Sequence, residues 1–220
     1  EMLQSEVGDP GARITLDRKG ARVLYTLNPR EVKYNPLTFL AVAKIFYAAG
    51  EDWTLGTKGW DVTNYALFSG DDAAGRLIAS RLASEVDRLG AQELVAAECG
   101  HGFWAMKWGM DCWLGGVPFS IRSILQLVAD YIREGRITLD PSVHGEPVTY
   151  HDPCNLCRKG CVVEEPRYIL AHTVQDFREM YPNREHNYCC GGGGGLLSAT
   201  EYAQTRLARG EPKAEQIRAT

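Results

Sequence analysis

Short apolar runs alternate with longer amphipathic segments along the first half of the chain. The runs at 21–29, 52–55 and 93–100 are brief and apolar, which predicts strands. The segments at 35–50 and 76–90 are longer, and each ends in a glycine that can close a helix. This alternation predicts an α/β fold with largely parallel strands.

The clearest helical period lies at 119–135. Its apolar positions recur at helical spacing and share one face: Ile121, Ile124, Leu125, Val128, Tyr131 and Ile132. We therefore expect one amphipathic helix over the whole segment.

The order of elements begins again at residue 146. A proline-ended strand is predicted at 146–154 and a helix at 164–182, and a glycine-rich turn then leads to a last helix at 201–220. We predict two pseudo-repeated, Rossmann-like βαβ lobes, although two unrelated segments that merely alternate strand and helix would give the same order. The expected domains are an N-terminal extension, a cysteine-poor first lobe and a cysteine-rich second lobe without its closing strand: residues 1–20, 21–137 and 138–220.

Composition narrows the classes of function. Hydrophobic residues make up 45% of the 220 residues and charged residues 24%, which is ordinary for a globular chain. The net charge is −4 and no run of Lys or Arg occurs, so we do not expect nucleic acid as a partner. No apolar run reaches the roughly 20 residues of a membrane span, and nothing resembles a signal peptide. Because the sequence starts without Met and ends inside a predicted helix, we expect a piece of a longer protein.

The cysteine content is the most unusual feature of the composition. The seven cysteines are Cys99, Cys112, Cys154, Cys157, Cys161, Cys189 and Cys190. Their number is odd, and a chain of this length does not need disulfides, so we expect a reducing cytoplasmic compartment with thiols for metal or redox chemistry. Cys99, Cys154 and the Cys189–Cys190 pair all follow predicted strands, where ligands of open α/β sheets gather.

Several kinds of site fit part of this pattern. Zinc could bind Cys154, Cys157 and Cys161 together with the adjacent pair, but neighbouring cysteines struggle to reach one tetrahedral ion. Cys154 and Cys157 have thioredoxin-type spacing, although their proline precedes the first cysteine. No Cys-x-x-Cys-His occurs for a c-type haem, and the glycines lack the Lys-Ser/Thr ending of a phosphate loop. An iron–sulfur cluster has several irons, so adjacent thiolates can each bind one.

Five glycines follow Cys190 without interruption, from Gly191 to Gly195. A cluster carries negative charge and sulfides that accept hydrogen bonds, and glycine amides can approach it with no side chain between. We therefore predict that Cys189 and Cys190 are ligands and that a collar of amide donors follows them: Gly191, Gly192, Gly193 and Gly194.

These residues resemble the cysteine-rich CCG domain of the heterodisulfide reductase family. The resemblance rests on "HDPC" at 151–154, a spacer of 34 residues and "CCGGGGG" from residue 189. The segments "YAAGEDWTL", "FSGDDAAG" and "ECGHGFW" are similar to the DsrK-like subunit of the membrane complex associated with dissimilatory sulfite reductase. The resemblance implies that Cys154, Cys189 and Cys190 bind a noncubane [4Fe-4S] cluster, whose remaining Cys-x-x-Cys ligands would lie beyond Thr220.

The resemblance also implies an iron–sulfur oxidoreductase that reduces or forms a disulfide or trisulfide on a small, DsrC-like sulfur-carrier protein in dissimilatory sulfur metabolism. Electrons would come from ferredoxin-type clusters in an N-terminal region, and other subunits would attach this cytoplasmic protein to a membrane-bound electron-transfer complex. Two alternatives stay open: an electron-transfer subunit of a glycolate- or lactate-type oxidase, and a non-catalytic module stabilised by zinc.

The first lobe departs from the pattern of family members with two sites. Arg30, Phe68 and Ser69 stand where those members have cysteines, and Gly102 stands where a partner of Cys99 would be. We therefore expect one cluster site.

The candidate catalytic residues are Cys99, His101 and His151, since a strand-end thiol could exchange with sulfur and the histidines could protonate a leaving thiolate. We expect Cys157 and Cys161 to be non-ligands. Cys112 and the aromatic segment around it, 103–113, are expected to pack in the core, with a substrate groove as the alternative for the aromatics.

Overall fold

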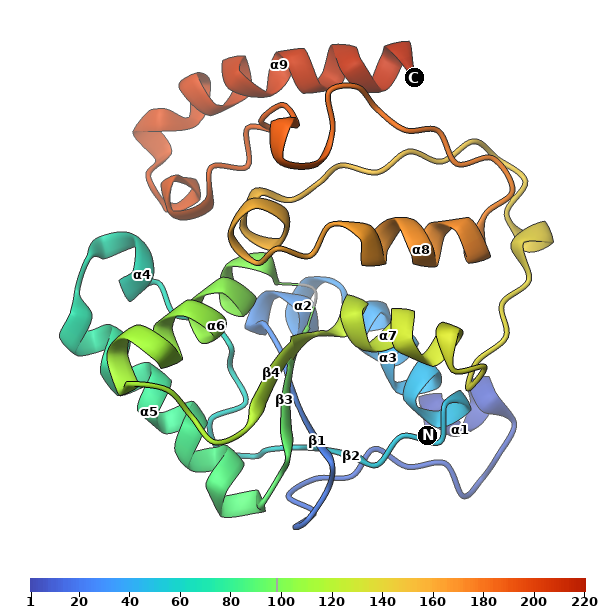
Figure 1. The fold of residues 1–220 in the computed structure, drawn as a ribbon, viewed down its shortest axis with the longest axis vertical. Coiled ribbons are helices and arrows are strands. Elements are labelled where there is room, and N and C mark those ends of the chain that lie inside the picture. The colour runs from blue at the N-terminus through green and yellow to red at the C-terminus, as the bar shows by residue number, and fades with distance from the viewer. Residues whose placement is uncertain (98) are drawn as a thin grey trace.

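The computed structural model describes residues 1–97 and 99–220, and a parallel β-sheet lies at its centre (Figure 1). Among these residues the strands lie in the order β2-β1-β3-β4, and every neighbouring pair is parallel. The strands are β1 (Val23–Thr26), β2 (Trp53–Leu55), β3 (Glu93–Ala96) and β4 (Ser120–Ser123). The predicted α/β class with parallel strands is confirmed, and three of the strands lie within the runs that predicted them.

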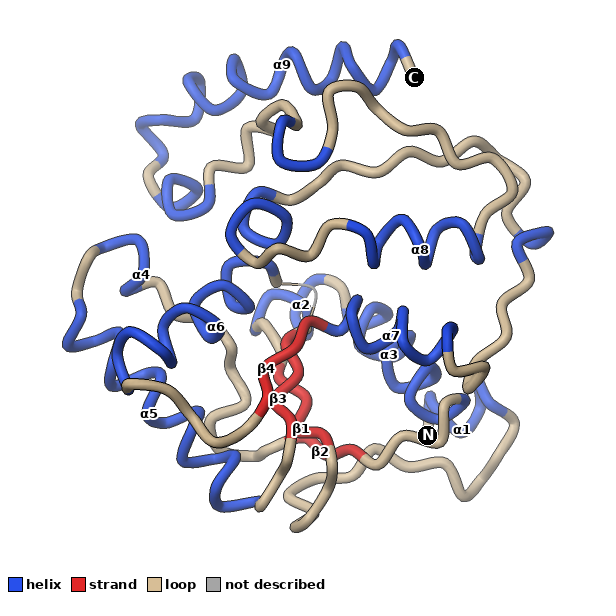
Figure 2. Tube along the Cα trace, viewed as in Figure 1, coloured by secondary structure: helices blue, strands red, loops and turns tan. Residues whose placement is uncertain are grey.

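Helices cover both faces of this sheet (Figure 2). Side chains alternate between the faces, so Val23 and Tyr25 join one apolar cluster while Leu24 and Leu94 join the other. The first cluster is closed by α1 (Met2–Val7), α3 (Pro36–Ala48) and α7 (Ile124–Arg133), and the second by α5 (Asp72–Leu89) and α6 (Gly100–Leu114). Two short helices, α2 (Pro29–Tyr34) and α4 (Ala66–Ser69), follow β1 and β2 in the chain.

Residues 138–220 form a mainly helical layer beyond the carboxyl ends of the strands (Figure 1). Its longer helices are α8 (Glu164–Thr173) and α9 (Ala203–Ala219), and a π-helical turn covers Asn155–Lys159. Short 3-10 turns lie at Pro141–Val143, Arg184–His186, Gly194–Ser198 and Thr200–Tyr202.

The predicted pseudo-repeat, with a second βαβ lobe, is not shown by the part of the chain that the structure describes. The segment at 146–154 is no strand, and only Val148 makes an isolated parallel bridge, to Phe177. The helix predicted over 164–182 ends at Thr173, because Val174 is extended and the chain turns toward that bridge. Cys154 and the Cys189–Cys190 pair therefore do not lie at strand ends, whereas Cys99 does.

The segment at 119–135 is a strand followed by a helix, so the prediction of one continuous helix is wrong. Ser120–Ser123 pairs with β3, and α7 starts only at Ile124. A capping box sets this boundary, since the Ser123 hydroxyl accepts from the backbone N–H of Leu125 and the Gln126 side chain accepts from that of Ser123.

Helix α6 was not predicted, because its glycines lower helix propensity. Two of them are required by close packing: a Cβ at Gly102 would lie 2.7 Å from Val62, and one at Gly109 would lie 2.5 Å from Trp113. The helix buries Phe103 and Trp113 in the core as expected, but Trp108 is exposed, so the prediction holds for only part of this segment. It leaves Cys112 exposed, so the prediction that Cys112 packs in the core is wrong.

Candidate functional site

The ends of β1 and β3 bring an asparagine, a cysteine and a histidine together. The Sγ of Cys99 accepts a hydrogen bond from Asn28 Nδ2 at 3.1 Å and lies 3.3 Å from Nδ1 of His101. Asn28 is held in this orientation because its Oδ1 caps α2 by accepting from the backbone N–H of Arg30. Asn28 follows β1, and Cys99 and His101 follow the neighbouring parallel strand β3, so the loops after these two strands together form a polar cluster around the thiol.

The imidazole of His101 is packed between aromatic rings. It stacks on Tyr65 with 4.8 Å between ring centroids, and Phe68 lies 5.5 Å away. Burial lowers the pKa of His101, with Asp61 acting against this and Arg30 adding to it. Burial therefore favours the neutral ring, and in the tautomer with a free Nδ1 that nitrogen can accept the proton of the Cys99 thiol.

Arg158 connects the turn of Cys154 to the backbone that leads into Cys189. Its Nη1 donates to the Sγ of Cys154 at 3.3 Å. The same guanidinium donates to the carbonyl oxygens of Glu185 and Asn187. One side chain from the π-helical turn thus ties together two segments that carry candidate ligands.

Asp152 also connects the turn of Cys154 to the segment that leads into Cys189. Its buried carboxylate accepts two hydrogen bonds from Arg167, at 2.7 and 2.8 Å, and a third from the backbone N–H of Arg184. Its carbonyl accepts from Asn187 Nδ2 at 2.7 Å. Although burial acts in the opposite direction, the hydrogen bonds from Arg167 hold the pKa of Asp152 below its ordinary value.

The Cys-Cys-Gly loop directs backbone amides at its own sulfurs. The N–H of Gly191 donates to Cys189 Sγ, and that of Gly192 donates to Cys190 Sγ, each at 3.4 Å. This fold of the loop uses glycine, because Gly191 has a φ of 76° and Gly193 one of 78°. Both thiols are exposed, so their side chains can turn toward a ligand.

Helix α9 supports the loop through one face. Arg206 donates from Nη1 to the carbonyl oxygens of Gly191 and Gly192. One turn later the backbone of Gly210 is so close that a Cβ there would lie 2.8 Å from the Cys190 carbonyl oxygen. Lys213 follows three residues on, which places it on the same face.

Lys213 is a buried cation without a carboxylate partner among the described residues. Only 4% of it is exposed, and its ammonium donates to Gln216 Oε1 and Met180 Sδ. Burial lowers the pKa of Lys213, while the charges of Asp152, Cys190 and Cys154 oppose that shift. An ammonium in such a place is costly unless negative charge is nearby. The sequence had offered no indication of Lys213 beyond its spacing from Arg206 and Gly210.

A cleft of about 490 Å³ joins the Cys99 site to the glycine loop. Its lining includes Asn28, Arg30, Cys99, His101, Pro153, Gly192 and Gly194. Phe68 bridges the two sides, since it packs on His101 and a Cβ at Gly195 would lie 2.8 Å from its Cβ. The first half of the chain thus faces the cysteine loop of the second half across this cleft.

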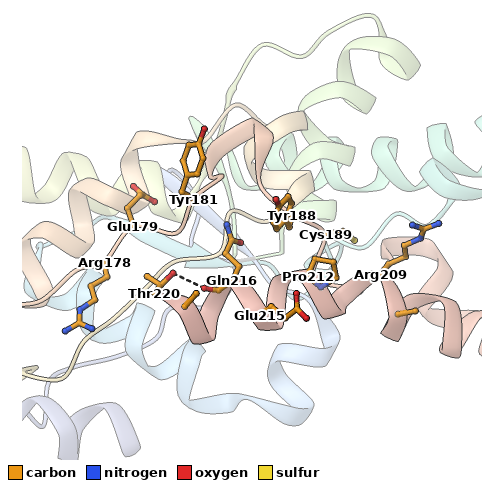
Figure 3. Close-up of a pocket in the computed structure, with 12 residues that line it drawn as sticks. Arg178, Glu179, Tyr181, Tyr188, Cys189, Arg209, Pro212, Glu215, Gln216 and Thr220 are labelled. Atoms are coloured by element: carbon orange, nitrogen blue, oxygen red, sulfur yellow. Dashed lines mark hydrogen bonds between the residues drawn. The ribbon is translucent and has the colours of Figure 1, made fainter.

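A second hollow of about 1090 Å³ opens on the other side of the loop, along α9 (Figure 3). Cys189 lies at its edge, and Arg178, Glu179 and Glu215 bring both signs of charge to its wall. The Cys189 thiol is therefore accessible from the α9 side, whereas Gly192 and Gly194 face the cleft that holds Cys99.

The remaining candidate residues differ in their surroundings. Burial raises the pKa of the Cys157 thiol to about 11, which favours an inert, protonated group. Cys161 is exposed. His151 is partly buried, and burial together with Lys213 lowers its pKa. Within residues 1–97 and 99–220, no three His, Cys, Asp or Glu side chains converge into a ready-made metal site.

A model of a known domain family matches the last third of the chain. Residues 148–220 match the family model described as CCG, cysteine-rich domain. This range contains Cys154, the Cys-Cys-Gly loop and α9, so the match includes the three cysteines of this chain that are candidate cluster ligands.

The chain is also distantly homologous to iron–sulfur proteins of the heterodisulfide reductase type. It is 30% identical over 201 residues to the Hdr-like menaquinol oxidoreductase iron-sulfur subunit of Archaeoglobus profundus, covering 75% of this chain and 36% of that protein. It is 32% identical over 170 residues to one subunit of the dihydromethanophenazine:CoB–CoM heterodisulfide reductase of Methanosarcina mazei, covering 74% of this chain and 41% of that protein.

A further relative is the EtfAB:quinone oxidoreductase of Syntrophomonas wolfei, 25% identical over 214 residues that cover 90% of this chain and 29% of that protein. The chain thus spans less than half the length of each of these relatives. No solved structure matches it. None of the described helices combines the length and the apolar run needed to cross a bilayer.

Proposed function

We propose that this chain is the cluster-binding part of an iron–sulfur oxidoreductase of the heterodisulfide reductase type. Cys154, Cys189 and Cys190 would hold the cluster. The homology to the Methanosarcina heterodisulfide reductase and to Hdr-like iron–sulfur subunits supports the class, and the match over 148–220 supports the location. The noncubane [4Fe-4S] form of the cluster is part of the proposal.

The observation that carries this proposal is the buried ammonium of Lys213 beside cysteines whose sulfurs receive backbone amides. Thiols are the soft ligands that iron–sulfur clusters use, and amide donors and a cation are the groups that stabilise their negative charge. The donor set therefore fits the group. Its three sulfurs do not yet converge, so metal binding would be coupled to a local turn of the exposed Cys189 and Cys190.

When bound, the cluster would supply electrons singly to a sulfur substrate or take them from it. The chain's own residues do the rest. Gly191 and Gly192 donate hydrogen bonds to the ligand sulfurs, and Arg158 donates to Cys154. Asp152 holds the two ligand-bearing segments together through its hydrogen bonds.

We further propose that the substrate is a disulfide or trisulfide on a sulfur-carrier protein, and that other subunits link this chain to a membrane-bound electron-transfer complex. The cleft between Cys99 and the glycine loop supports this proposal, because it is a hollow next to the proposed cluster ligands in which such a sulfur group could bind. Cys99 and His101 line it. His151, three residues before Cys154, is a candidate for exchanging a proton with a leaving thiolate.

The test is the metal and sulfide content of the full-length protein purified without oxygen, with EPR of the same sample. The expected result is about four irons and four sulfides per chain in excess of any other clusters, lost in Cys154→Ser, Cys189→Ser and Cys190→Ser. The exposed Cys112→Ser is the matched control and should keep the full content. Stoichiometric zinc without sulfide would reject the cluster and leave a structural module.

A second candidate is an electron-transfer subunit that carries out no sulfur chemistry. The homology to a protein named EtfAB:quinone oxidoreductase favours it. Reductive cleavage of a carrier-protein disulfide by the loaded protein separates the two: turnover supports the catalyst, and a loaded protein that only passes electrons supports the relay.

A further inference from the structure

We propose that Cys99, with His101 and Asn28, is a thiol–disulfide exchange site that takes up one half of an organic disulfide in the cleft opposite the Cys-Cys-Gly loop. The inference rests on the proposed function for its substrate class and goes beyond it in assigning a covalent step to a residue outside the CCG domain.

Geometry singles out Cys99 among the cysteines of the chain. Its sulfur lies within 3.3 Å of an imidazole nitrogen and receives a side-chain amide donor at 3.1 Å. Within residues 1–97 and 99–220, Cys99 is the one cysteine whose sulfur lies at hydrogen-bond distance from a histidine nitrogen. A base next to a thiol and a donor that stabilises its thiolate are the two groups that activate a cysteine nucleophile.

The position of Cys99 in the cleft indicates where a disulfide substrate would bind. Cys99 and His101 line the same cleft as Gly192, Gly194 and Pro153, which is adjacent to Cys154. Phe68 contacts both His101 and the glycine loop, so the two sides are held against each other by packing. A disulfide bound here would lie between the exchange thiol and the glycine loop that follows the proposed cluster ligands.

The rim of the cleft suits a disulfide with apolar neighbours. Tyr65, Phe68 and Leu197 line the cleft and each is more than a third exposed. Arg30 is the cation of the same lining and can stabilise the thiolate that forms.

The step balances without an external oxidant or reductant. The Cys99 thiol passes its proton to Nδ1 of His101 as its sulfur attacks one sulfur of the substrate. A Cys99–substrate disulfide forms, the original sulfur–sulfur bond breaks, and the other half leaves with the electron pair as a thiolate. One disulfide is thereby exchanged for another, and the proton on His101 can neutralise the departing group.

The experiment uses the full-length protein, reduced and handled without oxygen, and bis(2-hydroxyethyl) disulfide as a small neutral probe. After a short pulse the remaining thiols are alkylated, and peptide mass spectrometry gives the rate of mixed-disulfide formation at each cysteine. Cys99 is expected to react at least about tenfold faster than Cys112, which is more exposed but has no histidine nitrogen at its sulfur among the described residues. Cys112 is thus a reference inside every sample.

His101→Gln tests the role of the imidazole. It should slow Cys99 by about tenfold or more and leave the Cys112 rate unchanged, while the buried Cys157 should stay unreactive, which shows that the variant is folded. Asn28→Ser, which retains a helix-capping hydroxyl, should slow Cys99 as well because the amide donor is lost. Reaction of Cys99 no faster than that of Cys112, or an undiminished rate in His101→Gln, overturns the proposal.

Failure of this inference can be told apart from failure of the proposed function, because exchange at Cys99 needs no cluster. Zinc without sulfide, together with fast Cys99 exchange, rejects only the iron–sulfur function. A full complement of iron and sulfide with an unreactive Cys99 rejects only the exchange site.

Discussion

The backbone of Gly210 in α9 packs against the carbonyl of Cys190, and a Cβ at residue 210 would lie 2.8 Å from that oxygen. The second cysteine of the vicinal pair is therefore positioned by a helix that follows it by 13 residues. Four measurable consequences arise from this contact and from others around the site.

Gly210→Ala should destabilise the Cys-Cys-Gly loop. Replacing a glycine inside a helix by alanine would otherwise raise the stability of the helix by about 1 kcal/mol. The new methyl would push the loop off α9, at a cost of roughly 1–3 kcal/mol, and iron content should fall. Urea denaturation and iron analysis check both effects. Glu211→Ala, an exposed neighbour on α9, should change neither. A more stable Gly210→Ala protein with full iron content would contradict the close contact.

Lys213→Met should affect the empty and the loaded protein in opposite directions. Without a cluster, removing a buried ammonium that lacks a carboxylate partner in the described part of the chain should raise the thermal midpoint. In the loaded protein, the loss of this positive charge should lower the reduction potential of the cluster by roughly 50 mV. A shift of about 59 mV corresponds to a tenfold change in the equilibrium constant of a one-electron couple.

Potentiometric titration followed by EPR measures the potential of Lys213→Met. Arg218→Met removes an exposed cation from the same helix and should leave the potential unchanged. Equal potentials in Lys213→Met and in the unaltered protein would show that the ammonium does not act on the cluster.

Arg167→Met should destabilise the fold by about 3 kcal/mol, because it leaves the buried carboxylate of Asp152 without its main partner. Asp152 holds Arg184 and Asn187, so the ligand-bearing segments should also separate. The free energy of unfolding from urea titration is the measurement. Arg178→Met breaks an exposed pair with Asp176 and should cost less than about 0.5 kcal/mol. Equal losses in both variants would contradict a special role for Asp152.

His101 should titrate below the ordinary value of 6.5, because burial disfavours its charged form. As the pH falls below 6.5, His101 is protonated more readily in the unfolded chain than in the folded chain. The free energy of unfolding therefore decreases between pH 6.5 and the lower pKa of the folded protein. NMR of the imidazole Hε1 resonance gives the pKa directly. Comparing urea midpoints at two pH values, one on either side of 6.5, shows the stability effect, which His101→Gln should reduce. A midpoint above 6.5 would show that the ring is not held neutral.

The local sequence pattern was enough to predict the α/β class and to single out the Cys-Cys-Gly loop as a candidate ligand-binding segment. Apolar runs and glycine-ended helices are decided within a few residues, so β1, β2 and β3 lie within the predicted runs and α5 ends where it was predicted, although it begins earlier, at Asp72. The spacing from Cys154 to Cys189 is a property of the chain itself, and residues 148–220 match a cysteine-rich domain family.

Local pattern failed where a contact between distant segments decided the outcome. The Ser120–Ser123 strand exists because β3 pairs with it, and α6 tolerates its glycines because Val62 and Trp113 need the space. The segment at 146–154 has strand-like residues but only one bridging partner, at Phe177, so it does not form a strand.

The sequence by itself was enough to predict which residues carry the chemistry, because the types and spacing of Cys189, Cys190 and the glycines form a local pattern. Tertiary structure alone decided their surroundings. It placed Asn28 at the sulfur of Cys99, 71 residues away, and buried Lys213 on the face of α9 that supports the loop. Packing forces acting over such separations leave no periodic trace in the sequence, which is why these partners appear only when the chain is folded.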